Sequence, residues 1–172
     1  MTPTRRLIRQ RMLKLASKLG PQKRVLEVGI AGDDPPGANR EFFQAEEYLT
    51  LDKDAGLKPD YCNDIENLHT AAVPMHHFNL VICSQVLEHC WRLQPALAGL
   101  WLLVAHGGHL VVDVPFLYPP HGDAREEDYW RFTPAALEKL CQQAGFTVVD
   151  TWADPDWLLV SVLCRKGMSD GA

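Results

Sequence analysis

The chain has 172 residues, of which 47% are hydrophobic and 23% charged, a composition typical of one soluble globular domain. No apolar run of about 18 residues is present, and arginines interrupt the first apolar residues, so the sequence predicts neither a membrane span nor a secretory signal. Five scattered cysteines form no Cys-x-x-Cys pair, and we therefore expect reduced thiols and a cytoplasmic protein.

The net charge of −5 conceals a basic N-terminal segment, because residues 1–24 carry eight basic side chains and no acid. The simpler interpretation is the solvated face of a helix. The alternative is an arm that binds RNA or an anionic membrane surface. Since no aromatic residue interleaves these charges, we expect no nucleic-acid partner.

Hydrophobic spacing predicts helices that alternate with strands. Residues 4–19 form an amphipathic helix that ends at Gly20-Pro21. Further helices are predicted at 95–105, before Gly107-Gly108, and from Thr133-Pro134 to Gly145. Residues 32–37 are predicted to form a loop. Strands are predicted at 25–29, 48–51, within 60–65, and at 79–83, 110–114, 147–151 and 158–163.

This alternation predicts an α/β fold with a Rossmann-like, doubly wound sheet covered on both faces. The last two strands are separated only by residues 152–157, a link too short for a crossover helix, so this pair is predicted to be antiparallel. We expect a mostly parallel sheet with an antiparallel last strand. Residues 1–172 would form a single domain, with a basic amphipathic helix at 1–20 and the Rossmann-like core at 22–166.

A nucleoside site is predicted at the carboxyl ends of the first two strands. Gly29 ends the first strand, where a glycine permits a sharp turn and close approach of a ligand. Asp52 ends the second strand, where an acid can bind both ribose hydroxyls. The glycine spacing does not fit a dinucleotide-binding Gly-x-Gly-x-x-Gly motif, which sets an NAD-dependent dehydrogenase aside.

The charge of this region indicates which nucleoside it would bind. Glu27 precedes the glycine turn, and Asp33 and Asp34 follow it, where a pyrophosphate would be repelled. S-adenosylmethionine carries an ammonium and a sulfonium and no phosphate. An acidic pocket therefore suits it as the cofactor.

Over nearly its whole length the chain resembles class I S-adenosylmethionine-dependent methyltransferases. The matching segments are VLEVG (25–29), LDKD (51–54), CNDIENL (62–68), FNLVICSQVLEH (78–89) and HGGHLVVDVP (106–115). The DYWRFTP segment (128–134) is similar to one in a bacterial subgroup associated with sugar and polysaccharide pathways. Ala31 and Asp33 depart from the family, which usually has glycine at both positions.

The resemblance implies a set of cofactor contacts that follow the strand ends. Glu27, Gly29, Ile30 and Ala31 would line the methionine end, and Asp52 would hold the ribose with Lys53 beside it. Asp64 and Ile65 would hold the adenine, and Ser84 and Gln85 would lie under the methionine part.

The loop 116–131 is expected to contact the methyl acceptor. His121 is the preferred general base because imidazole titrates near neutral pH. His89, implied by the resemblance to face the acceptor cavity, is the rival, and Tyr129 or Trp130 could form an acceptor wall. We expect no metal, although the acids of 123–128 could recruit a divalent cation.

The predicted activity is methyl transfer to an oxygen or nitrogen of a small molecule or sugar-type acceptor. Two alternatives remain: a non-catalytic, methyltransferase-like binding module, and an RNA methyltransferase that uses the basic helix. The sequence leaves open the acceptor and the oligomeric state, including a dimer.

Overall fold

A computed structural model describes residues 3–30, 37–68, 73–121 and 127–168. The chain begins with helix α1, and the other helices are α2 and α3, with three short 3-10 helices, η1 to η3, in the connections. The helical segments are α1 (Pro3–Leu19), η1 (Ala55–Leu57), η2 (Ile65–Asn67), η3 (Leu87–His89), α2 (Leu93–Leu103) and α3 (Pro134–Gln143). The strands are β1 (Gln22–Val28), β2 (Ala45–Asp52), β3 (Tyr61–Cys62), β4 (Phe78–Ser84), β5 (Val104–Pro115), β6 (Phe146–Ala153) and β7 (Leu159–Lys166).

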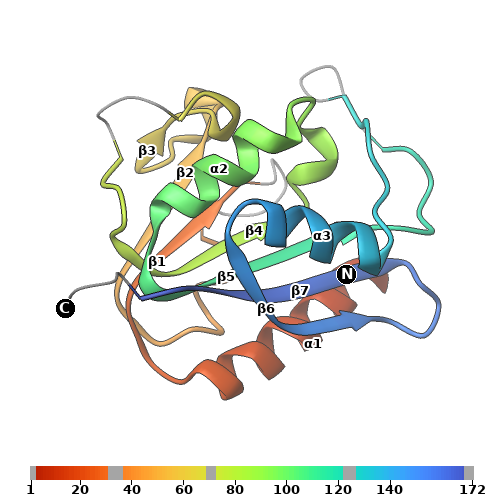
Figure 1. Ribbon diagram of the computed structural model, residues 1–172, viewed down its shortest axis with the longest axis horizontal. Helices are drawn as coiled ribbons and strands as arrows, with labels where there is room; N and C mark the ends of the chain where they lie inside the picture. Colours follow the sequence, from red (N-terminus) through yellow and green to blue (C-terminus); the bar gives the residue numbers. More distant parts are fainter. Residues whose placement is uncertain (1–2, 31–36, 69–72, 122–126, 169–172) are drawn as a thin grey trace.

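The seven strands form one sheet in the order β3-β2-β1-β4-β5-β7-β6 (Figure 1). The pairs from β3 to β5 are parallel, and β7 is antiparallel to both β5 and β6. The predicted α/β fold, mostly parallel with an antiparallel last strand, is confirmed. The reversed strand lies inside the sheet, and β6 forms the edge.

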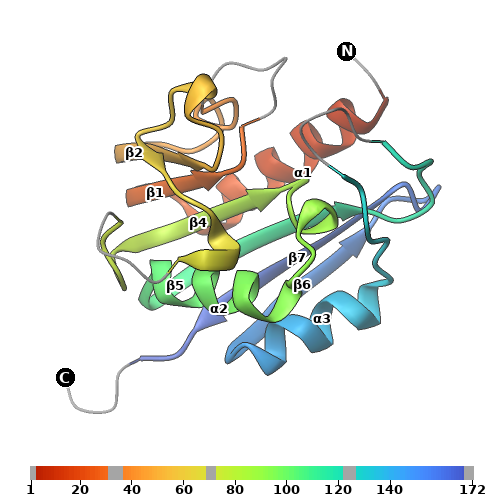
Figure 2. The same ribbon diagram turned by 90° about the horizontal axis from the view of Figure 1, so that it is seen from above.

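The sheet is covered on both faces, as expected for a doubly wound fold (Figures 1 and 2). Helices α2 and α3 lie on one face and α1 on the other. Alternate residues of β4 divide between these layers: Val81 belongs to the core beneath α2 and α3, while Leu80 and Ile82 pack with α1. This period of two is what a strand buried on both faces requires.

The basic helix α1 is a packed layer of the fold. Its apolar side contributes Met12 and Leu15 to the core. Arg11 is only 4% exposed, donates from Nε to Ser161 Oγ at 3.1 Å, and pairs with Asp150 at 2.8 Å. At least one of the basic side chains of α1, Arg11, therefore makes its contacts within the fold.

Helix α2 ends four residues before the glycine pair predicted to stop it, and residues 104–109 belong to β5. The reason lies far along the chain. Lys166 is 1% exposed, and its Nζ donates to the carbonyl oxygens of Trp101 at 2.7 Å and Val104 at 2.9 Å. A buried ammonium at a helix C-terminus satisfies carbonyls that have no partner within the helix.

Strand β3 is a two-residue strand that extends the sheet beside the end of β2, where Cys62 pairs in register with Asp52. Cys62 is exposed, whereas the other four cysteines are buried. Among the described residues, no helix is both long enough and apolar enough to cross a membrane.

Candidate active site at the carboxyl edge of the sheet

The strand order reverses between β1 and β4, which is where doubly wound sheets bind their ligands. Gly29 follows β1 with φ +84°, and Val86 lies just beyond β4. A Cβ atom at Gly29 would lie 2.2 Å from Val86 Cγ2. Only glycine therefore allows these two segments to meet at this distance.

Asp52 fixes the turn that follows β1. This residue is 7% exposed, and its Oδ2 accepts the Ile30 amide at 2.7 Å. Its Oδ1 accepts the Asp54 amide, also at 2.7 Å. The predicted ribose-binding acid thus lies beside the predicted glycine turn, with Lys53 exposed next to it. Ala31, the remaining residue of the predicted turn, lies outside the described residues.

Glu27 ties β1 to β2 and to the segment between them. It is 5% exposed and accepts hydrogen bonds from Tyr48 Oη at 2.7 Å and Asn39 Nδ2 at 2.6 Å. Burial, together with this carboxylate, raises the pKa of Tyr48 far above its usual value, so the phenol remains a donor. The acid predicted at the methionine end is therefore held rigidly.

Asp64 and Ile65 follow β3, and Asp64 caps η2. Its Oδ1 accepts the Glu66 amide at 2.9 Å, the usual bond of an N-cap aspartate. Ile65 is 4% exposed and packs against α2. A Cβ atom at Gly99 of α2 would lie 2.6 Å from the Ile65 carbonyl oxygen, so this glycine lets η2 approach the helix.

Ser84 ends β4, Gln85 follows it, and both are bonded to Asp113 of β5. Ser84 Oγ donates to the Asp113 carboxylate, and the backbone N–H of Gln85 donates to the Asp113 carbonyl oxygen at 2.8 Å. Gln85 has φ +56°, a left-handed conformation that a non-glycine residue rarely adopts. Asp113 is fully buried, which raises the pKa of its carboxyl group to about 7.

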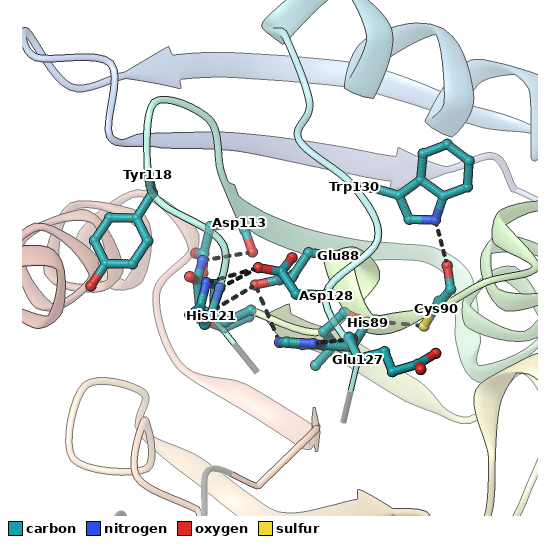
Figure 3. A network of polar contacts seen from close by, with 12 residues as sticks. Glu88, His89, Cys90, Asp113, Tyr118, His121, Glu127, Asp128 and Trp130 are labelled. Carbon is teal, nitrogen blue, oxygen red and sulfur yellow. Dashed lines mark hydrogen bonds and ion pairs between the residues drawn. The ribbon is translucent and has the colours of Figure 1, made fainter. Parts of the chain in front are cut away.

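The two histidines predicted as general bases meet at a third residue, Glu88 (Figure 3). The Nε2 atoms of His89 and His121 each lie 3.9 Å from Glu88 Oε1. Glu88 is fully buried, and burial raises the pKa of its carboxyl group to about 8. We call Glu88, His89 and His121 the His–Glu cluster. Glu88 and His89 lie in η3, which follows β4, and His121 lies in the loop after β5. Strands β4 and β5 are neighbours in the sheet.

Further contacts orient both rings of the His–Glu cluster. His89 Nδ1 lies 2.8 Å from the Glu127 carbonyl oxygen, and His121 Nδ1 lies 3.3 Å from Asp128 Oδ2. Burial lowers the pKa of His121, which keeps its ring neutral at pH 7 despite the nearby carboxylate.

Asp128 is itself held by Arg131. Arg131 binds both carboxylate oxygens of Asp128, at 2.6 Å for Oδ2, and donates to the carbonyl oxygens of Tyr118 and Pro119. Burial would raise the pKa of Asp128, but the bonds from Arg131 and the His121 amide outweigh it and lower the pKa to about 2.

A family model described as a methyltransferase domain matches residues 3–151. The chain belongs to this family. The predicted class I methyltransferase is thus confirmed, while the bacterial subgroup suggested by the segment 128–134 stays a prediction. No curated protein matches the methyltransferase.

Solved structures share the fold of this methyltransferase. One is 1,6-didemethyltoxoflavin-N1-methyltransferase from Burkholderia thailandensis, with bound 1,6-didemethyltoxoflavin and S-adenosylhomocysteine. Its TM-score is 0.69 at 20% identity, covering 91% of this chain and 76% of that chain. Another is the N-methyltransferase NodS from Bradyrhizobium japonicum WM9 in complex with S-adenosyl-l-homocysteine, with a TM-score of 0.66 at 17% identity, covering 96% of this chain and 88% of that chain.

Tyr129, the third predicted catalytic residue of the methyltransferase, lies at the surface. It is 41% exposed, and its hydroxyl group donates to the Glu127 carboxylate. Its ring contacts Trp91, which in turn stacks on Trp130. The structure therefore brings His89 and His121 together and places Tyr129 in an exposed aromatic group.

Sequence reasoning missed Glu88 and Asp113. Asp113 had a visible signal, because it is an acid inside the apolar run LVVDVP near the end of a strand. The signal for Glu88 was weaker: it follows only two apolar residues, Val86 and Leu87, shortly after β4. An acid at such a position is expected to be buried and is therefore a candidate for a functional role.

Proposed function

We propose that this methyltransferase transfers the methyl group of S-adenosylmethionine to an oxygen or nitrogen of a small molecule. The observation that carries the proposal is the bond between Asp52 and the Ile30 amide at the point where the strand order reverses. It brings an acidic group and a glycine turn to the position where an α/β sheet binds a nucleoside.

The residues at this edge fit the cofactor chemically. Each Asp52 oxygen accepts one amide and keeps a further lone pair, which suits two ribose hydroxyl groups. We assign Asp64 and Ile65 to the adenine, and Ser84 and Gln85 to the methionine part. Glu27 and the segment 29–31 would take the methionine end, where carboxylates suit an ammonium group and a positive sulfur.

The acceptor would bind near the His–Glu cluster. When bound, S-adenosylmethionine supplies a methyl group on a positively charged sulfur. His121 Nε2 can accept the proton that the acceptor loses as its lone pair takes the methyl group, because the imidazole is neutral at pH 7. His89 is the alternative base, and Tyr129 with Trp91 offers an aromatic wall to the acceptor.

Calorimetry with S-adenosylhomocysteine tests the cofactor assignment, and the chain offers a matched control. Asp154 is 2% exposed and, like Asp52, accepts two backbone amides, those of Asp156 and Leu159, but it lies in the β6–β7 turn. We expect Asp52→Asn to weaken binding at least about tenfold, since an amide cannot accept from two hydroxyl groups as a carboxylate does. Asp154→Asn should bind as the wild type does.

Two outcomes would overturn the proposal. One is a folded wild-type protein that binds neither S-adenosylmethionine nor its demethylated product at about 1 mM. The other is cofactor binding without transfer of a labelled methyl group to any member of a broad acceptor panel. The second outcome would favour the non-catalytic binding module.

A further inference from the structure

The His–Glu cluster contains a buried carboxyl group whose side-chain oxygens make no hydrogen bond to any described residue. Glu88 is 0% exposed, and within the described parts of the chain neither of its side-chain oxygens accepts a hydrogen bond. A buried polar group without a hydrogen-bond partner costs free energy, and a bound cation is one group that can satisfy it. A cation bound at this position would supply the missing partner.

The geometry around Glu88 fits a metal ion. One ligand atom from each of Glu88, His89 and His121 can be chosen so that all lie within 4.8 Å of one another. Both Nε2 atoms lie 3.9 Å from the same Glu88 oxygen. An ion bonded to nitrogen and oxygen at about 2.0–2.2 Å can span at most about 4.4 Å, so both 3.9 Å separations lie within its reach.

Outer contacts hold both rings with their Nε2 atoms near Glu88. His89 Nδ1 faces a backbone carbonyl, that of Glu127, and His121 Nδ1 faces the Asp128 carboxylate. The Glu127 carbonyl can only accept, which places the proton of His89 on Nδ1 and its lone pair on Nε2, toward Glu88. His121 Nδ1 also lies 3.4 Å from Arg131 Nη2, so the two contacts of this nitrogen hold the ring in place. Metal-binding histidines nearly always make such a contact through their second nitrogen.

We propose that Glu88, His89 and His121 bind one divalent ion of the first transition row. Two imidazoles and a carboxylate form a ligand set that such ions accept, for example Zn²⁺, Fe²⁺ or Co²⁺. Three protein ligands leave at least one coordination position open, and the His121 side chain is 38% exposed, so the site is accessible from that side.

This site differs from the sequence-based expectation of no metal. His89 and His121 are far apart in the chain, and they meet only because β4 and β5 end side by side. One consequence rests on the proposed function: with the ion bound, an acceptor oxygen could take the open position. The ion would then lower the pKa of the acceptor, in place of proton removal by His121.

Titration of the chelator-treated full chain with Co²⁺ tests the site without measuring turnover. Co²⁺ bound to histidine absorbs visible light, and Zn²⁺ can be followed by calorimetry in parallel. We expect one equivalent to bind the wild type, and Glu88→Gln, His89→Gln and His121→Gln each to weaken binding at least about tenfold. His77→Gln is the matched control, because His77 lies 3.8 Å from Glu47 in a partly exposed pair outside the His–Glu cluster.

S-adenosylhomocysteine calorimetry and circular dichroism on the same samples separate the possible failures. If the folded wild type binds S-adenosylhomocysteine but neither metal at about 1 mM, the metal site is wrong and the proposed function stands. Equal metal binding by the wild type, His89→Gln and His121→Gln would also overturn the site. Metal binding without binding of S-adenosylhomocysteine would instead overturn the function and leave the metal site in place.

Discussion

At the scale of single residues, the candidate site depends on Gly29, which lets the segments after β1 and β4 touch. We predict that Gly29→Ala destabilises the protein by about 3 kcal/mol, because it combines a positive φ with a clash at 2.2 Å against the stiff Val86 side chain. Binding of S-adenosylhomocysteine should fall in parallel. Urea denaturation and calorimetry measure the two effects.

Gly20→Ala is the control for this prediction. Gly20 also has a positive φ, +68°, but no atom within 4 Å of an added Cβ, so only backbone strain of about 1 kcal/mol is expected. Adding Val86→Ala to Gly29→Ala should restore part of the lost stability. Equal losses at Gly29 and Gly20, with no recovery in the double variant, would show that the contact with Val86 is unimportant.

Only part of the candidate site could be predicted from the sequence. Gly29 and Asp52 were predictable because Gly29 directly follows a strand and Asp52 ends one, and strand ends can be located from local hydrophobic spacing. The partnership of His121 with Glu88 was not, since it depends on how the loop after β5 folds back over η3. The burial of Glu88, which decides its chemistry, is a property of the packed molecule.

At the scale of secondary-structure elements, α1 has one buried and one exposed side. Leu15 is 1% exposed and Leu13 is 49% exposed. We predict that Leu15→Ala lowers the free energy of unfolding by about 2–5 kcal/mol, because it opens a cavity between α1 and the sheet. Leu13→Ala should stay within about 0.5 kcal/mol of the wild type.

Urea denaturation of both variants checks this prediction. A loss of stability at Leu15 no larger than that at Leu13 would mean that α1 does not pack on the sheet. It would also revive the interpretation of the basic segment as an arm for another molecule.

The element boundaries show where local sequence signals fail. The position of α3 was predictable because Thr133 caps it and Pro134 opens it. The end of α2 was not, because it is set by Lys166 at the far end of the chain. The short link after β6 predicted an antiparallel pair but could not place β7 beside β5, which is decided by packing across the whole sheet.

At the scale of the whole molecule, the centre of the sheet contains a carboxyl group that prefers to be protonated. Burial raises the pKa of Asp113 from 3.8 to about 7. The folded state therefore binds this proton more tightly than the unfolded state does. The resulting stability is fully present below pH 3.8 and is lost as the pH rises to 7.

Asp113→Asn tests this dependence, because the amide cannot titrate. Between pH 4 and pH 8 the wild type should lose stability relative to the variant, by up to about 4 kcal/mol if burial acts in full. Comparing the two proteins at each pH removes the contributions of all other groups. If the free energies of unfolding follow the same curve, Asp113 ionises in the folded state without cost.

The short strand β3 has a practical consequence for experiments. Cys62 is the one exposed thiol among five cysteines, and it pairs in register with Asp52. A maleimide dye would therefore attach at a single place on the native molecule, beside the predicted ribose position. Its fluorescence could report occupancy of the nucleoside pocket in real time, without mutagenesis.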